Sequence, residues 1–241
     1  IGSNRILLNY ITGVLPELDV YGVKQMTMEQ LFVRLLYEDW DEKKMSVKPP
    51  EKGAEEKGRI AWFHALEAYC AALEWRAVPR EDIAINRADY GIYGVKETHP
   101  AAARSKLLLP RDAIETYIRE NPQISIQNKI RMLNERIAAK VNNEIAGKEV
   151  GYTPEEKKEL CRKFRFHFGP KRWKKPIFEI YEDFLAQQER EDKPVPYEKD
   201  RFDVYDLAAL AYLYKRVKET EEIREASHVV IDEAQDFGMT A

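Results

Sequence analysis

Apolar side chains recur every three or four residues along most of the chain, a spacing that places them on one face of a helix. In the first such stretch the apolar set is Met28, Leu31, Phe32, Leu35 and Leu36. The same spacing predicts helices over residues 60–76, 110–121, 126–141, 177–185 and 204–217. The last of these is apolar on nearly all sides, so we expect it to be buried.

Capping residues mark the starts of two helices. Thr27 precedes the first helix and is a favourable N-cap. Thr153 and Glu156 form the two halves of a capping box, with a proline between them at the first helical position. We expect this second helix to continue to about Phe168, because a Gly-Pro pair follows at once.

Segments between the helices carry loop and strand signals. Residues 41–58 are strongly charged and contain Pro49 and Pro50, which predicts a linker or mobile loop and a domain boundary. Residues 83–85 and 90–95 alternate small and large side chains and could form a short hairpin. On the helix at 126–141, Lys129, Arg136 and Lys140 fall outside the apolar stripe, so we expect them to form a solvated basic edge.

The segment at 228–236 joins a short β-branched stretch to a cluster of acids. Such a pattern is typical of a buried parallel strand that brings carboxylates to its C-terminal edge, where ligands bind in open α/β sheets. Asp232 could hold Mg²⁺, which prefers hard oxygen ligands, and Glu233 could orient the water that attacks a phosphate. The same acids could instead only cap the next helix. The Ala-Gln-Asp that follows favours the first interpretation.

The string Asp-Glu-Ala-Gln-Asp at 232–236 resembles motif II, the Walker B box, of UvrD/Rep-like superfamily 1 helicases. The resemblance implies that Asp232 coordinates Mg²⁺ and that Glu233 activates water. It also implies that Gln235 and Asp236 couple the nucleotide state to neighbouring motifs. Residues 4–18 resemble the motif Ia region of the HelD branch, the RNA polymerase-associated helicase-like proteins, and residues 205–213 resemble the stretch that precedes motif II there.

A Walker A loop, Gly-x-x-x-x-Gly-Lys-[Ser/Thr], is absent from the 241 residues. The resemblance therefore implies an internal fragment, running from motif Ia to motif II, of an ATP-hydrolysing parent protein. ATP and Mg²⁺ would bind the parent, and the fragment alone is expected neither to bind a cofactor nor to hydrolyse ATP.

The fold class that the resemblance implies is α/β, with a partial RecA-like (P-loop NTPase) domain formed by both chain ends and a large, mainly helical insertion. The expected domains are residues 1–40 and 201–241 for the RecA-like part and 41–200 for the insertion. In the HelD branch this insertion engages the RNA polymerase core and helps to release it from nucleic acid. In a conventional DNA-translocating helicase the same position holds a small DNA-binding subdomain, which is the alternative function.

Positive charge is concentrated between Lys157 and Lys175, a segment that we call the basic run. It holds nine lysines and arginines and one acid, Glu159, whereas the whole chain has a formal net charge of -3. Aromatic residues alternate with the cations, a composition that can stack bases and neutralise phosphates. The candidate contacts to nucleic acid or polymerase are Lys163, Arg165, Lys171, Arg172, Trp173, Lys174 and Lys175.

Other interpretations of this region stay open. Phe164 and Phe168 could pack into the helical core, and Trp173 could anchor the next helix. The cations could form only a solvated face. If the insertion enters a basic polymerase channel, the acidic tract from Glu179 to Asp192 could serve as well as the basic run.

The remaining chemistry of the chain is sparse. Cys70 and Cys161 are too few for a disulfide framework, which favours a reducing, cytoplasmic setting, and we expect Cys70 to be core packing. The histidines show no metal-ligand spacing. No apolar run approaches the length of a membrane span and no secretory signal is evident, so no membrane partner is expected.

Overall fold

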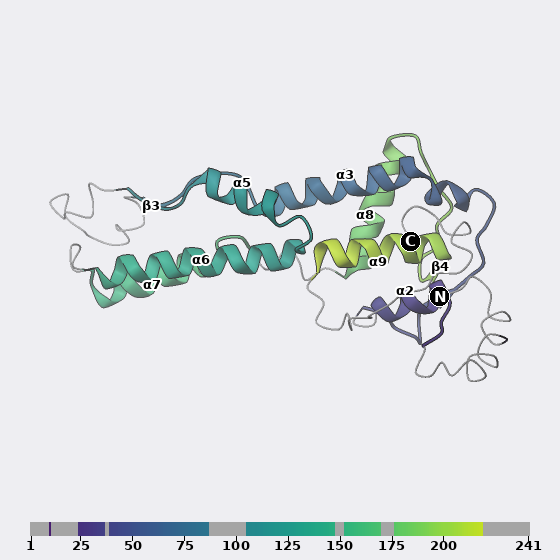
Figure 1. Ribbon diagram of the computed structural model, residues 1–241, viewed down its shortest axis with the longest axis horizontal. Coiled ribbons are helices and arrows are strands. Elements are labelled where there is room, and N and C mark those ends of the chain that lie inside the picture. The colour runs from purple at the N-terminus through teal and green to yellow at the C-terminus, as the bar shows by residue number, and fades with distance from the viewer. Residues whose placement is uncertain are drawn as a thin grey trace. The chain divides into compact units, whose positions relative to one another are not determined.

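The computed structural model describes residues 10, 24–36, 39–86, 105–147, 152–169 and 176–218. The described part is mainly helical with two small sheets (Figure 1). Its α-helices are α2 (Met28–Leu35), α3 (Ile60–Ala77), α5 (Arg111–Glu120), α6 (Ile126–Ala146), α7 (Pro154–Phe164), α8 (Ile177–Arg190) and α9 (Val204–Val217). A 3₁₀ helix, η2 (Ala54–Gly58), and the strands β1 (Ser46–Val47), β2 (Ile83–Ile85), β3 (Lys106–Leu109) and β4 (Arg201–Phe202) complete it.

The chain divides into two compact units, with the division inside α3 and again before α8. Unit 1 comprises the described residues of 1–71 and 175–241, and unit 2 those of 72–174. Unit 2 therefore lies inside the predicted insertion at 41–200. The RecA-like assignment of the two chain ends stays a prediction, because most of residues 1–40 and all of 219–241 lie outside the described residues.

Helix α9 is the centre of unit 1. Both α2 and α8 pack against it, as Figure 1 shows. Its side chains Leu207, Leu210 and Leu213 are fully buried, which confirms the expectation of a helix enclosed on most sides. Burying a leucine side chain contributes about 1.5–3 kcal/mol, so this helix supplies much of the hydrophobic stabilisation of the unit.

Residues 41–58 are not a free linker, contrary to the sequence prediction. Strand β1 pairs in parallel with β4, with Ser46 opposite Arg201 and Val47 opposite Phe202. The Lys48 side chain, only 7% exposed, reaches a carboxylate oxygen of Glu198 at 3.2 Å. One of the charges that suggested a solvated loop, that of Lys48, therefore bonds this segment to a residue 150 positions later in the chain.

Unit 2 is built on a pair of helices, α6 and α7, that lie side by side (Figure 1). The apolar stripe predicted for α6 is confirmed, since each of its members is buried: Ile126, Ile130, Leu133, Ile137 and Val141. Strand β2 was predicted, and it pairs antiparallel with β3, which was not. The other strand expected in that hairpin, at 90–95, lies outside the described residues.

The capping predictions are confirmed at both helices. The Thr27 and Thr153 hydroxyls each accept a hydrogen bond from the third helical residue, and the side chain of that residue bonds back to the cap. Helix α7 nevertheless ends at Phe164, four residues earlier than expected. The reason is that Asn134 of α6 bonds both the backbone N–H and the carbonyl of Phe168, which replaces the helical pattern there.

Candidate functional site

The residues predicted to act on the nucleotide lie outside the described residues. Most of the candidate contacts in the basic run lie outside them as well. This applies to Asp232, Glu233, Gln235 and Asp236, and to Lys171, Arg172, Trp173, Lys174 and Lys175. Lys163 and Arg165 are described, and both are exposed in unit 2. The described residues also contain two buried ion clusters and a groove that the sequence did not indicate.

Unit 1 contains a buried lysine held by two aspartates. The Lys57 Nζ atom lies 2.7 Å from Asp203 Oδ2 and 2.7 Å from Asp206 Oδ1, and it also donates to the Pro196 carbonyl at 3.0 Å. The three charged side chains are at most 2% exposed. With Tyr181, whose hydroxyl donates to Asp206 Oδ1 at 2.7 Å, they form what we call the Lys57 cluster.

Helix α9 begins inside this cluster. Asp203 is its N-cap and accepts hydrogen bonds from the N–H groups of Tyr205 and Asp206, while Asp206 Oδ2 accepts from the N–H of Asp203 at 3.2 Å. Burial raises the pKa of Asp206, against the opposing effect of Lys57. One lysine faces two buried carboxylates that also cap a helix, so removing the lysine would leave both carboxylates without their cation, away from water.

Two members of the Lys57 cluster carry a signal in the sequence. Asp203 and Asp206 have the spacing of a capping box before an apolar run, a signal that could have been found. Lys57 could not, because its partners lie 146 and 149 residues away.

A second buried ion pair lies in unit 2. Lys129 Nζ is 2.6 Å from Glu74 Oε2, and Arg80 is 3.1 Å from the other oxygen of that carboxylate. Lys129 is 1% exposed, so its predicted place on a solvated basic edge is wrong. The lysine lies outside the apolar stripe by spacing, but Glu74 supplies the charge that lets it be buried. Arg80 also lies over the exposed Trp75 ring, 4.7 Å from its centre.

The basic run contains a structured turn at residues 165–168, which we call the α7 turn. Phe164 and Phe168 on either side of the exposed Phe166 are buried, as the core-packing interpretation proposed. The ring of His167 stacks on Phe164, with centroids 6.0 Å apart, and burial lowers the pKa of this histidine. The turn thus has an apolar side toward the helices and an exposed side that carries Arg165 and Phe166.

A groove of about 300 Å³ runs along α8 in unit 1. Glu182, Leu185, Ala186, Glu189, Pro194, Val195 and Tyr197 line it. The Tyr197 hydroxyl donates a hydrogen bond to Glu182 Oε1 at 3.1 Å, so two of the residues that line the groove are bonded to each other. Four of these seven residues belong to the acidic tract from Glu179 to Asp192 that the sequence marked as a possible contact, and the other three follow it.

In the part of the chain that the structure describes, no group of three or more histidine, cysteine or acidic side chains is arranged to hold a metal ion. Cys70 is buried, as expected for core packing, and Cys161 is exposed. None of the described helices combines the length and apolar character needed to cross a bilayer.

Comparisons of the chain with protein-family models, with curated proteins and with solved structures find no match. The resemblance carried by residues 232–236 therefore rests on the sequence alone.

Two tyrosines of unit 1, the buried Tyr181 and the half-buried Tyr212, predict a loss of stability at alkaline pH. Burial raises the pKa of Tyr212 to about 12 and that of Tyr181 well above the usual value. Unfolded tyrosine ionises near pH 10. Between about pH 10 and 12 the unfolded chain releases protons that the folded chain retains, so the free energy of unfolding falls as the pH rises.

Urea unfolding at pH 8, 9.5 and 11 measures this effect. Tyr212→Phe should flatten the decline, because its hydroxyl contributes to the difference in bound protons. An unfolding free energy that is equal at pH 8 and pH 11 would contradict the prediction.

Proposed function

We propose that the chain is part of an ATP-dependent, superfamily 1 helicase-like protein of the HelD type. The observation that carries the proposal is the Asp-Glu-Ala-Gln-Asp string at 232–236, directly after a β-branched stretch. In this assignment Asp232 holds Mg²⁺, Glu233 orients the attacking water, and Gln235 and Asp236 communicate with neighbouring motifs. ATP and Mg²⁺ belong to the complete protein, since these 241 residues contain no Walker A sequence.

The order of elements supports this assignment. Helix α9 precedes the motif and is buried, as the stretch before a central strand of an α/β domain should be. The chain also returns to unit 1 after unit 2, and β1 and β4 pair in parallel near the two predicted boundaries of the insertion. Parallel pairing of distant segments with a helical excursion between them suits an inserted domain.

Unit 2 is the part that we propose to engage the RNA polymerase core and to help release it from nucleic acid. Its helices α6 and α7 form a pair with a basic, exposed turn. The alternative is a DNA-binding subdomain of a conventional translocating helicase. The exposed positions of Lys163 and Arg165 favour that alternative, because cations at the surface are accessible to phosphates.

Equilibrium binding of the 241-residue chain to core RNA polymerase, and separately to single- and double-stranded DNA, distinguishes the two. The binding variant replaces Lys171, Arg172, Lys174 and Lys175 by glutamine. Its matched control replaces four exposed cations of unit 1, Lys43, Lys44, Lys52 and Arg59, so that both variants lose the same charge.

Polymerase engagement predicts saturable, salt-tolerant binding to the core enzyme. The DNA alternative predicts binding to DNA without polymerase that falls steeply with salt and is weakened only in the first variant. A chain that binds neither the polymerase nor DNA would overturn both.

A further inference from the structure

The α7 turn, residues 165–168, exposes one aromatic ring between two buried ones. Phe164 and Phe168 are buried, whereas Phe166 is 55% exposed. An exposed phenylalanine in a turn contributes little to a core, because most of its surface remains in water. The ring is therefore available to a ligand.

The turn is held from the helix beneath it. Asn134 of α6 donates from Nδ2 to the Phe168 carbonyl at 3.0 Å and accepts the Phe168 N–H on Oδ1 at 3.0 Å. These bonds are buried, and together they tie the turn to the middle of α6. Phe166 is thus presented by a fixed backbone, which lowers the entropy lost when a ligand is bound.

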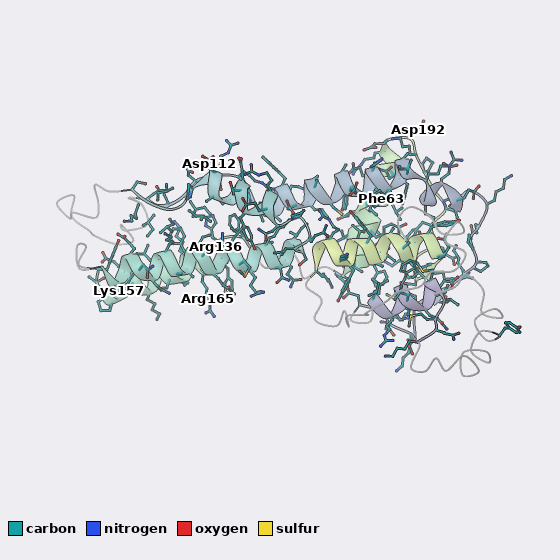
Figure 2. All side chains as sticks on the ribbon, viewed as in Figure 1. Phe63, Asp112, Arg136, Lys157, Arg165 and Asp192 are labelled. Carbon is teal, nitrogen blue, oxygen red and sulfur yellow. The ribbon has the colours of Figure 1, made fainter. Side chains whose placement is uncertain are left out.

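One guanidinium lies over the exposed ring. The Arg165 guanidinium lies 5.1 Å from the centre of the Phe166 ring, and Arg165 has no carboxylate partner among the described residues. Figure 2 shows Arg165 pointing away from α6 and α7. The one acid between Lys157 and Gly169, Glu159, is paired with Arg162. In the part of the chain that the structure describes, Arg165 therefore carries its charge beside Phe166 without an ion pair, although Glu81 acts on the neighbouring His167.

Unit 2 contains a second exposed ring with an arginine over it, but that arginine has a carboxylate partner. Trp75 is 57% exposed and Arg80 lies over it at 4.7 Å, much as Arg165 lies over Phe166. The Arg80 side chain, however, is only 8% exposed and is paired with Glu74 at 3.1 Å. The guanidinium over Trp75 is therefore paired with a carboxylate, so Trp75 is a suitable control for Phe166.

We propose that Phe166 and Arg165 form a contact for single-stranded nucleic acid, in which a base stacks on Phe166 and the adjacent phosphate contacts Arg165. An exposed ring can stack only on a base that is not already paired and stacked in a duplex. The contact is independent of base identity, because stacking uses the face that all bases share. The inference extends the proposed function but does not depend on the ATPase assignment.

Fluorescence anisotropy with a labelled oligothymidylate tests the contact. Phe166→Ala should weaken binding by about tenfold, within the range measured for a single base–aromatic stack. Phe166→Trp should retain binding, and Trp75→Ala should leave it within about twofold of the unchanged chain. Arg165→Gln should make the slope of the logarithm of affinity against the logarithm of salt concentration shallower, by about the amount expected for one phosphate contact. Circular dichroism of each variant confirms that the helices are intact.

Three results would overturn the inference: no binding of the oligonucleotide at low salt, equal binding of an unlabelled duplex competitor of the same length, or a Phe166→Ala chain that binds like the unchanged one. Polymerase binding is measured on the same variants to separate the two proposals. Polymerase binding without oligonucleotide binding would overturn this inference alone. Oligonucleotide binding that depends on Phe166, without polymerase binding, would support it and overturn polymerase engagement.

Discussion

Replacing Lys57 by methionine is expected to lower the free energy of unfolding by about 3–5 kcal/mol, the usual cost of removing one partner from a buried ion cluster. The side chains of Asp203 and Asp206 are at most 2% exposed, so without Lys57 two carboxylates would share a site with little access to water. Methionine is unbranched and only one atom shorter than lysine, so the loss measures charge more than packing. Urea unfolding followed by circular dichroism provides the value.

The matched control is Lys52→Met, at an exposed lysine of the same segment, which should change stability by less than about 0.5 kcal/mol. Combining Lys57→Met with Asp206→Asn should recover part of the loss, because the asparagine removes one unpaired charge. If Lys57→Met were no more destabilising than Lys52→Met, the cluster would not carry the stability that its burial indicates.

The helices of this protein follow from local sequence, and the ion clusters do not. Periodicity is a property of neighbouring residues, and the stripes of α6 and α9 are buried as their spacing predicts. The burial of Lys57 does not follow from local sequence, because a charged residue in a charged, proline-containing segment is typical of a loop. Its burial depends on two aspartates brought to it by the fold.

Lys129 demonstrates the same limit within a well-predicted helix. Its spacing places it outside the apolar stripe of α6. The prediction of the helix is confirmed, whereas the prediction that Lys129 is exposed is wrong. The deciding partner, Glu74, lies 55 residues earlier, on α3. Sequence patterns therefore predict which face of a helix is apolar, but not which cations the rest of the fold will cover.

The α7 turn is an intermediate case. Phe164 and Phe168 are four residues apart, and that spacing suffices to expect both on one side and Phe166 on the other. The end of the helix at Phe164 was not predictable, because it depends on the bonds from Asn134 of α6 to the backbone of Phe168. The residue types of the candidate contact came from the sequence, whereas its fixed geometry came from tertiary structure.

Replacing Glu233 by glutamine is expected to reduce ATP turnover of the complete helicase-like protein by about 10²-fold or more, the range for loss of a positioned general base. Glutamine has the same shape but no negative charge, so it neither accepts a proton nor orients water as a carboxylate does. Nucleotide binding should persist, because in the proposed arrangement Asp232, and not Glu233, holds Mg²⁺.

Steady-state ATP hydrolysis and equilibrium nucleotide binding, measured on the same preparations, test this role. Glu120→Gln, at an exposed acid of unit 2, is the matched control and should leave both values unchanged. Asp232→Asn should instead weaken Mg²⁺-dependent nucleotide binding, which separates the roles of the two adjacent acids. Undiminished turnover in Glu233→Gln would remove Glu233 from the reaction. A joint loss of turnover and binding would point to a role in holding the nucleotide, because a residue that acts on water alone leaves the bound ground state intact.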